Sequence, residues 1–318
     1  MKKRLLSGIT PSGTGNLHIG NYFGALKQWV DLQDSHESLI FVSDLHALTV
    51  IHDKEQLKSN IINVVLDYLG AGIDPEKVIL FKQSDISAHP ELCWVFNCIT
   101  TMPYLERAHA YKDAHMKAKE INVGLFDYPL LMSADILLYD SDVVPVGADQ
   151  KQHVEYARDT AQKFNNTFGE TFKLPEPMIL DGVAVVPGTD GRKMSKSYGN
   201  TIPLFGSDEE IKKAVMGIVT DSDGKFPQNV FAIHSLLPFY SKDEISKIYE
   251  DHPKEYKWLK EKLAEDLIKF ITPMCERRDM YAKDLDKVKE ILKKGGEKAR
   301  EIAEKKMKIV RDNIGVNI

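Results

Sequence analysis

The chain has little cysteine and no long hydrophobic run. Cys93, Cys98 and Cys275 form no CxxC pair, which excludes a disulfide framework or a cysteine-rich zinc site and suits a reducing compartment. No apolar run reaches the roughly 18 residues of a transmembrane helix, and the apolar stretch 5–9 after the basic start is too short for a secretory signal. We therefore expect a cytoplasmic protein with no membrane partner.

Positive charge is scarce overall but concentrated near the end of the chain. The net charge is −5, whereas residues 283–311 carry eleven Lys or Arg against six Asp or Glu, a local net charge of +5. Two interpretations stay open. The segment is either a solvated helix face laced with i,i+4 ion pairs or a surface that follows nucleic-acid phosphates.

Up to about residue 200, short apolar runs alternate with helical patterns. Strands are predicted at 5–9, 38–42, 78–82 and 143–146, and helices at 20–32 and 57–69. This alternation is typical of a parallel sheet covered on both faces. We predict an α/β fold, with a Rossmann-like parallel-sheet domain over 1–203 and a helical domain over 204–318.

The second region reads as helices only. Apolar residues recur at helical spacing over 259–271, and Pro273 is expected to end that helix. The pair Gly295-Gly296 is expected to separate two further basic helices.

A loop rich in glycine follows the first predicted strand and opens a helix. It reads Pro11-Ser12-Gly13-Thr14-Gly15-Asn16-Leu17-His18-Ile19-Gly20-Asn21. Glycines let backbone approach a ligand closely, and a helix N-terminus offers N–H groups to phosphates. His18 and Asn21 are expected there as hydrogen-bond donors to phosphate oxygens. An ordinary strand–turn–helix connection with a solvent-facing histidine is the alternative.

A lysine-rich motif follows much later in the chain. Lys193-Met194-Ser195-Lys196-Ser197 comes directly after the glycine-bracketed run 188–192. Two lysines on a loop that can move could reach the negative charge that develops on departing phosphates. A basic surface turn is the alternative.

Between these motifs, one acid stands among apolar residues. On a helix, Tyr128, Met132 and Asp135 occupy i, i+4 and i+7 and share a face. A buried carboxylate costs several kcal/mol unless it is paired, so Asp135 needs a backbone N–H, an arginine or a ligand donor. The next predicted strand ends at Gly147, and ligands lie at such strand ends in open α/β sheets.

The two motifs, in this order, resemble the HIGH and KMSKS signatures with which class I aminoacyl-tRNA synthetases handle ATP. Asn21 takes the last position of the first, and 193–197 matches the second letter for letter. Ala134-Asp135-Ile136-Leu137-Leu138-Tyr139 and Val144-Pro145-Val146-Gly147-Ala148-Asp149-Gln150-Lys151-Gln152-His153 resemble the core of the bacterial tryptophanyl-tRNA synthetases. Shorter matches at 24–26, 44–47, 105–107, 158–159 and 220–223 spread the resemblance over most of the chain.

The resemblance implies an enzyme that activates L-tryptophan with ATP and loads it onto the 3′ end of tRNA(Trp). Residues 1–203 would be the activation domain, with a connective insertion around 90–130. Residues 204–318 would read the anticodon, and the last helix is a candidate to pack back on the catalytic domain. Mg²⁺ would accompany ATP without a dedicated metal site, no tightly bound cofactor is expected, and the family works as a homodimer.

The resemblance also implies residue roles. Asp135 would accept the hydrogen bond of the indole N–H, which is a donor only. The tryptophan site would be completed by Leu6, His46, Tyr128, Met132, Val144, Val146 and Gln150, with Tyr128 and Gln150 on the ammonium group. ATP would be bound by Thr10, Pro11, Ser12, Gly20, Asn21, Gly147, Ala148, Asp149, Val186, Lys193, Met194, Ser195, Lys196 and Ser197. The catalytic residues would be His18, Asn21, Lys193 and Lys196.

Two features depart from the family pattern. Leu6 stands where family members often place a phenylalanine against the indole, and the first loop is two residues longer than in common relatives. The alternatives to tryptophan activation are a tyrosine-specific synthetase of the same fold, a paralogue that has lost aminoacylation and serves in binding or regulation, and a nucleotidyltransferase that uses no tRNA.

Overall fold

The described part of the chain comprises residues 2–12, 16–108, 111–112, 121–145, 151–178, 186–220 and 226–318 of a computed structural model. Its centre is a five-stranded sheet in the order β3-β2-β1-β4-β5, in which every pair is parallel. The strands are β1 (Arg4–Ile9), β2 (Glu37–Val42), β3 (Val78–Lys82), β4 (Val143–Pro145) and β5 (Glu176–Met178). The predicted parallel α/β sheet is confirmed.

The four predicted strands are all present, whereas β5 carried no recognised signal. Val146 lies outside the described residues, so β4 is given only to Pro145. The fifth strand has three residues, one of them Pro177, and pairs with β4 alone. Such a short edge strand has too few alternating positions to stand out in a sequence.

The two faces of the sheet follow from alternation along the strands. Leu5 and Ile40 belong to one apolar core, and Leu6 and Leu39 to the other, because successive side chains of a strand point to opposite faces. The first core is covered by α2 (Lys27–Leu32), α4 (Lys54–Ala71) and α13 (Tyr256–Ala282). The second is covered by α5 (Ala88–Ile99), α8 (Val123–Leu137), α9 (Lys151–Phe168) and α14 (Leu285–Ile314).

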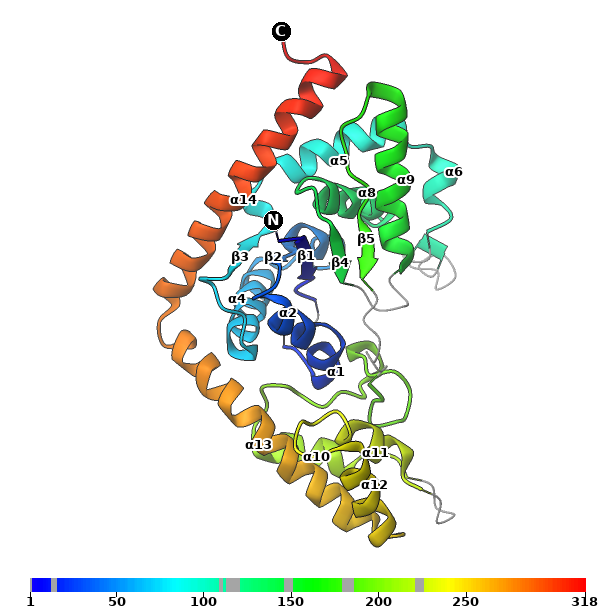
Figure 1. The fold of residues 1–318 in the computed structure, drawn as a ribbon, viewed down its shortest axis with the longest axis vertical. Helices are drawn as coiled ribbons and strands as arrows, with labels where there is room; N and C mark the ends of the chain where they lie inside the picture. The colour runs from blue at the N-terminus through cyan, green and yellow to red at the C-terminus, as the bar shows by residue number, and fades with distance from the viewer. Residues whose placement is uncertain are drawn as a thin grey trace.

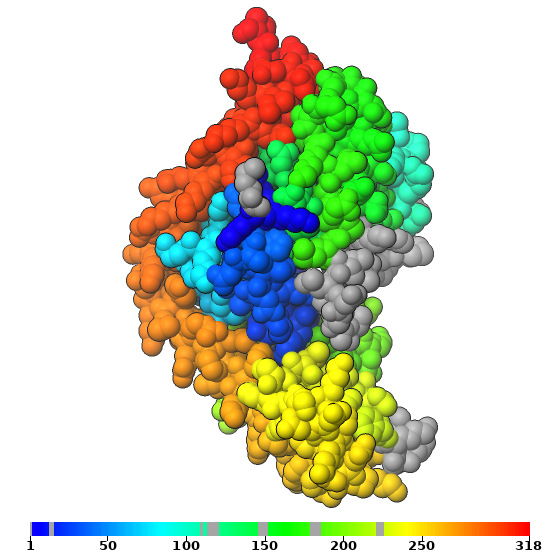
Figure 2. Space-filling model, in the orientation of Figure 1, coloured from blue at the N-terminus to red at the C-terminus, as the bar shows by residue number. Residues whose placement is uncertain are grey.

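A helical lobe lies beyond the carboxyl ends of the strands (Figure 1). It is made of α10 (Asp208–Met216), α11 (Gln228–His234), α12 (Lys242–Asp251) and the first part of α13. Figure 2 shows this lobe, in yellow, below the sheet lobe. Within the described ranges, no helix is long and apolar enough to span a membrane.

The expectation that Pro273 ends a helix is wrong. Pro273 lies inside α13, which continues to Ala282. An interior proline costs about 3 kcal/mol, but Leu263, Leu267 and Ile271 before it and Met274 after it are all buried on the same helix. Their burial, at about 1.5–3 kcal/mol for each side chain, outweighs the break.

The expectation that Gly295-Gly296 separates two helices is also wrong, because α14 runs through both residues. The glycines serve close packing instead of chain reversal. A Cβ on Gly295 would collide with the backbone oxygen of Leu80 in β3, whereas one on Gly296 would meet Asp85 at an ordinary 3.6 Å. The helix therefore needs the glycine to lie directly on the sheet.

Candidate functional site

The two signature motifs meet although 171 residues lie between Asn21 and Lys193 in the chain. His18 forms an isolated antiparallel bridge with Pro203. The Ile19 amide donates to Ile202 O at 3.0 Å, and the Leu204 amide donates to Leu17 O at 3.1 Å. The segment that follows the lysine motif is thus hydrogen-bonded to the glycine-rich loop.

Gly20 is the point of closest approach between the motifs. A Cβ there would stand 2.9 Å from Nδ1 of His18 and 3.2 Å from Cβ of Met194. A side chain at this position would therefore crowd both the histidine ring and the methionine.

His18 is the N-cap of α1 (Ile19–Asn21), and Asn21 is the last residue of that helix. Asn21 Oδ1 accepts from the His18 amide at 3.0 Å, which leaves the Asn21 amide hydrogens for other partners. His18 is buried, and burial, reinforced by the charge of Lys196, lowers its pKa to about 4. Its ring is therefore neutral near pH 7 and acts as a hydrogen-bond donor or acceptor, not as a cation.

Asn200 holds the lysine motif in a compact turn. Its Nδ2 donates to Asp190 Oδ1 at 2.6 Å and to Lys193 O at 3.2 Å, and its Oδ1 accepts from the Ser195 amide at 2.8 Å. Lys196 begins the short helix η4 (Lys196–Tyr198). Its Nζ donates to Ser12 O at 3.4 Å, and burial lowers the pKa of this ammonium group.

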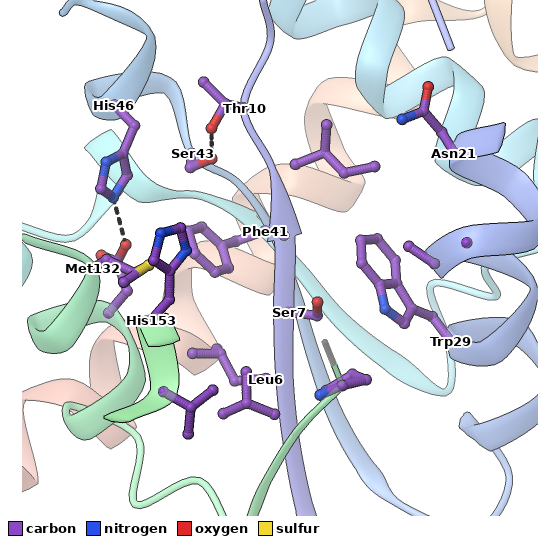
Figure 3. A pocket seen from close by; sticks show the side chains of 18 of the residues that line it. Leu6, Ser7, Thr10, Asn21, Trp29, Phe41, Ser43, His46, Met132 and His153 are labelled. Carbon is purple, nitrogen blue, oxygen red and sulfur yellow. Dashed lines mark hydrogen bonds and ion pairs between the residues drawn. The ribbon is translucent and has the colours of Figure 1, made fainter. Parts of the chain in front are cut away.

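A cavity of about 690 Å³ opens at the carboxyl ends of β1, β2 and β4. Figure 3 shows its wall on both sides of β1, with Leu6, Phe41 and Met132 on one side and Asn21 and Trp29 on the other. The predicted residues that line it are Leu6, Thr10, His18, Gly20, Asn21, His46, Tyr128, Met132, Asp135, Val144, Lys193, Met194 and Ser195. Sheet order brings them together, because β1 and β4 are neighbours where the chain reverses its winding direction.

Other predicted residues are not among those that line the cavity. Pro11, Ser12, Lys196 and Ser197 adjoin lining residues in sequence, and Val186 O accepts from the Met194 amide at 2.9 Å. Val146, Gly147, Ala148, Asp149 and Gln150 lie outside the described residues, so their predicted roles remain predictions.

Asp135 is the buried acid of the cavity, and its partners are neither a backbone N–H nor an arginine. Oδ1 accepts from Gln83 Nε2 at 2.7 Å and lies 2.6 Å from His89 Nδ1, while Oδ2 lies 2.9 Å from His46 Nε2. Burial alone would raise the pKa of Asp135, but the two histidines outweigh it and lower the pKa to about 2. A carboxylate offers about four lone-pair sites, so one acceptor site remains for a ligand.

Phe41 is a lining residue to which the sequence assigned no role. It lies on β2 opposite Gly8 of β1, two residues along from Leu6, and its ring stacks on Phe81 with a centroid separation of 5.6 Å. A Cβ on Gly8 would come within 2.9 Å of this ring, so glycine at that position makes room for it. Its position in the sequence could have indicated this role. Phe41 lies near the carboxyl end of a predicted strand, two residues before Ser43, which also lines the cavity.

His153 is a second lining residue to which the sequence assigned no role. Its Nε2 lies 3.5 Å from the Tyr128 hydroxyl, and both side chains line the cavity. The His46 ring meets Tyr128 edge-on at 6.2 Å. Three polar rings therefore cluster at the end of the cavity that holds Asp135.

Residues 1–293 match the family described as tRNA synthetases class I (W and Y). The chain belongs to this family. The synthetase is 49% identical to the tryptophan–tRNA ligase of Fusobacterium nucleatum over 99% of this chain and 98% of the relative. It is 46% identical to the tryptophan–tRNA ligase of Rhodopirellula baltica over 98% of this chain and 99% of the relative.

A solved structure of the same kind is similar along its whole length. The tryptophanyl-tRNA synthetase of Campylobacter jejuni, complexed with ADP and tryptophan, is 43% identical, with a TM-score of 0.90, and the match covers 98% of this chain and 99% of that chain. The synthetase thus has both the fold and the two signature motifs of the tryptophan members of its family.

Proposed function

We propose that the synthetase activates L-tryptophan with ATP and transfers it to the 3′ end of tRNA(Trp). The observation that carries the proposal is Asp135, an ionised acceptor in a cavity wall to which Leu6, Phe41, Met132 and Val144 contribute apolar side chains. Indole is an apolar ring with one donor and no acceptor, so it complements this wall.

The chemistry divides between the two sides of the cavity. The tryptophan carboxylate would attack the α-phosphorus of ATP, forming tryptophanyl-adenylate and releasing pyrophosphate. The terminal ribose hydroxyl of tRNA would then attack the acyl carbon, and AMP would leave. On the nucleotide side, neutral His18 and the Asn21 amide would donate to phosphate oxygens, and Lys193 and Lys196 would stabilise the charge that develops on pyrophosphate.

Mg²⁺ would enter with the phosphates of ATP. Within the described residues, no group of three His, Cys, Asp or Glu side chains is arranged to hold a metal ion, and Asp135 is already committed to two histidines. A phosphate-borne Mg²⁺ fits these residues, because this ion usually keeps several waters and takes few protein ligands. It would supply positive charge to the phosphates when bound.

We also infer that two copies of the chain associate through the surface formed by α5, α6 (Met102–Leu105) and the start of α8. Trp94, Met102 and Val123 there are 70%, 62% and 80% exposed, beside a hollow of about 750 Å³. Exposed apolar side chains grouped in this way favour a protein interface, and the family resemblance favours a second copy. Sedimentation should give a dimer that Trp94→Asp dissociates, and a monomeric wild type would contradict the inference.

Exchange of labelled pyrophosphate into ATP, with each amino acid supplied separately, tests the proposed function. Tryptophan should support exchange and tyrosine should not. If tyrosine supports exchange better than tryptophan, the protein is a tyrosine-specific synthetase of the same fold. If none of the amino acids supports exchange, it is a paralogue that serves in binding.

Lys196→Ala tests the role of the lysine motif in the same assay. Loss of a charge aimed at developing phosphate charge should lower the rate of adenylate formation by about 10²–10³, with tryptophan affinity unchanged. A wild-type single-turnover rate would remove Lys196 from the mechanism.

A further inference from the structure

Asp67 is a buried acid behind the glycine-rich loop, outside the cavity. It lies on α4 and is 1% exposed. Its Oδ2 accepts from the Leu17 amide at 3.0 Å, and its Oδ1 accepts from Arg278 Nε at 2.6 Å. One carboxylate therefore joins the first signature motif to α13, and its ion pair spans 211 residues of sequence from Asp67 to Arg278.

The guanidinium of Arg278 is held by several partners. Its Nη2 donates to Asn63 Oδ1 at 3.2 Å, and its Cζ lies 5.4 Å from the centre of the Phe205 ring. The two helices approach so closely at Gly70 that a Cβ there would stand 2.7 Å from Cβ of Arg278. The ion pair is thus built into the packing of α13 on α4 and is not a surface contact.

The same carboxylate faces the lysine motif electrostatically. Asp67 raises the pKa of Lys196, against the stronger opposing effect of burial, and Lys196 in turn lowers the pKa of Asp67. Lys196 Nζ reaches the glycine-rich loop at Ser12 O. Within the described ranges, the charged groups that act on Asp67 are Arg278 of α13 and Lys196 of η4, and Asp67 in turn raises the pKa values of Cys275 of α13 and Tyr68 of α4.

We propose that Asp67 and Arg278 form a positioning pair for ATP, which holds Leu17 and His18 in register and draws Lys196 toward the loop. The proposal rests on the proposed use of ATP. The contact with the Leu17 amide gives the pair its purpose, because it fixes the residue next to His18. The pair also makes ATP binding depend on how α13 is seated, so a shift of the helical lobe would reach the phosphates through Arg278.

Steady-state exchange kinetics test the pair. Asp67→Asn and Arg278→Ala should raise KM for ATP by about tenfold or more and lower kcat, since misplacing a reacting group by 1 Å costs on the order of 10²-fold. KM for tryptophan should stay unchanged, because Asp135 and the apolar wall are not touched. Arg278→Lys keeps the charge but loses the guanidinium fork, so it should recover the effect only in part.

Arg277→Ala is the matched control. Arg277 Nε donates to Gly70 O at 3.0 Å and so joins the same two helices without reaching Asp67. It should lower the melting temperature and leave both KM values unchanged. If Arg277→Ala changes the kinetics as Arg278→Ala does, the pair is structural and the proposal is wrong. The same holds if Asp67→Asn and Arg278→Ala raise KM for tryptophan as much as KM for ATP.

The pH profile gives a second readout. Burial raises the pKa of Asp67 to about 6, although Arg278, the Leu17 amide and Lys196 oppose the rise. Below this pH the carboxylate takes up a proton and the ion pair is lost, so KM for ATP should climb more steeply in the wild type than in Asp67→Asn. Protonation of ATP contributes equally to both proteins. Identical profiles would overturn the proposal, whereas absence of exchange in the wild type would instead overturn the proposed function.

Discussion

At the scale of single residues, the site combines one ionised acceptor with neutral donors. Asp135 keeps its charge because two histidines lower its pKa to about 2, and His18 stays uncharged because burial lowers its pKa to about 4. Both shifts favour the deprotonated form, which is an anion for the acid and a neutral ring for the base. The proposed selectivity for indole and the proposed donation to phosphate would both depend on these states.

Asp135→Ala should lower kcat/KM for tryptophan by orders of magnitude and narrow its preference over phenylalanine. A site built around one hydrogen bond rejects ligands that leave it unpaired, by about 10⁴–10⁵ in favourable cases. KM for ATP should hardly change. Asp135→Asn preserves the shape and should recover part of the loss, and retention of wild-type discrimination by both variants would make Asp135 a structural acid.

The ionised state of Asp135 also has a pH consequence. A folded-state pKa near 2 lies below the ordinary value of about 3.9, so the stability from its histidine contacts is present above the ordinary value and is lost as the pH falls through the folded-state pKa. The affinity for tryptophan, measured by calorimetry, should therefore not fall at mildly acidic pH through protonation of Asp135. A loss of affinity near pH 4 in the wild type that is absent from Asp135→Asn would contradict the lowered pKa of Asp135.

Phe41 supplies the aromatic wall that Leu6 does not. Phe41→Leu should raise KM for tryptophan by about two- to tenfold, as expected for loss of an aromatic contact of about 0.5–1.5 kcal/mol, with KM for ATP unchanged. The double variant Leu6→Phe with Phe41→Leu should restore the affinity for tryptophan, because it moves the aromatic ring to the neighbouring strand. Phe81→Leu, behind Phe41 and fully buried, is the control, and an equal rise in KM there would assign the effect to general loosening.

At the scale of elements, α14 packs closely on β3 because Gly295 has no side chain. Gly295→Ala should destabilise the protein by about 1–3 kcal/mol or more, as overpacking does, because the new methyl group meets the backbone of β3. Gly296→Ala, one residue on, meets Asp85 at 3.6 Å and should stabilise by about 0.5–1 kcal/mol, since alanine favours a helix. Denaturant unfolding distinguishes the two, and equal effects would refute the packing role of Gly295.

At the scale of the whole molecule, the basic stretch 283–311 stabilises the fold and is also exposed to solvent. Lys289, Lys294 and Lys305 each pair with an acid on the same helix, whereas buried Lys306 and Arg311 hold α14 to Asp140 and Glu91. The solvated-face interpretation accounts for the first set. A contact with tRNA stays a prediction for the exposed face.

Charge reversal at Lys293 and Lys294 should weaken tRNA binding and flatten its salt dependence, since fewer counterions are released. Pyrophosphate exchange should be unchanged. The charge swap Glu290→Lys with Lys294→Glu keeps both the ion pair and the net charge, so it should bind tRNA as the wild type does. Unchanged affinity and salt slope in the charge-reversal variant would leave the stretch as a solvated face.

The sequence by itself indicated four of the five strands, helices over 20–32, 57–69 and 259–271, and both signature motifs, because periodicity and loop chemistry are local properties. It also marked Asp135, since an acid on an apolar helix face must find a partner. Only the tertiary structure decided that the partners are His46 and His89, that Phe41 lines the cavity together with Leu6, and that Gly295 packs α14 on the sheet. These contacts join residues far apart in the chain, and their geometry depends on strand order and helix packing, which no local pattern encodes.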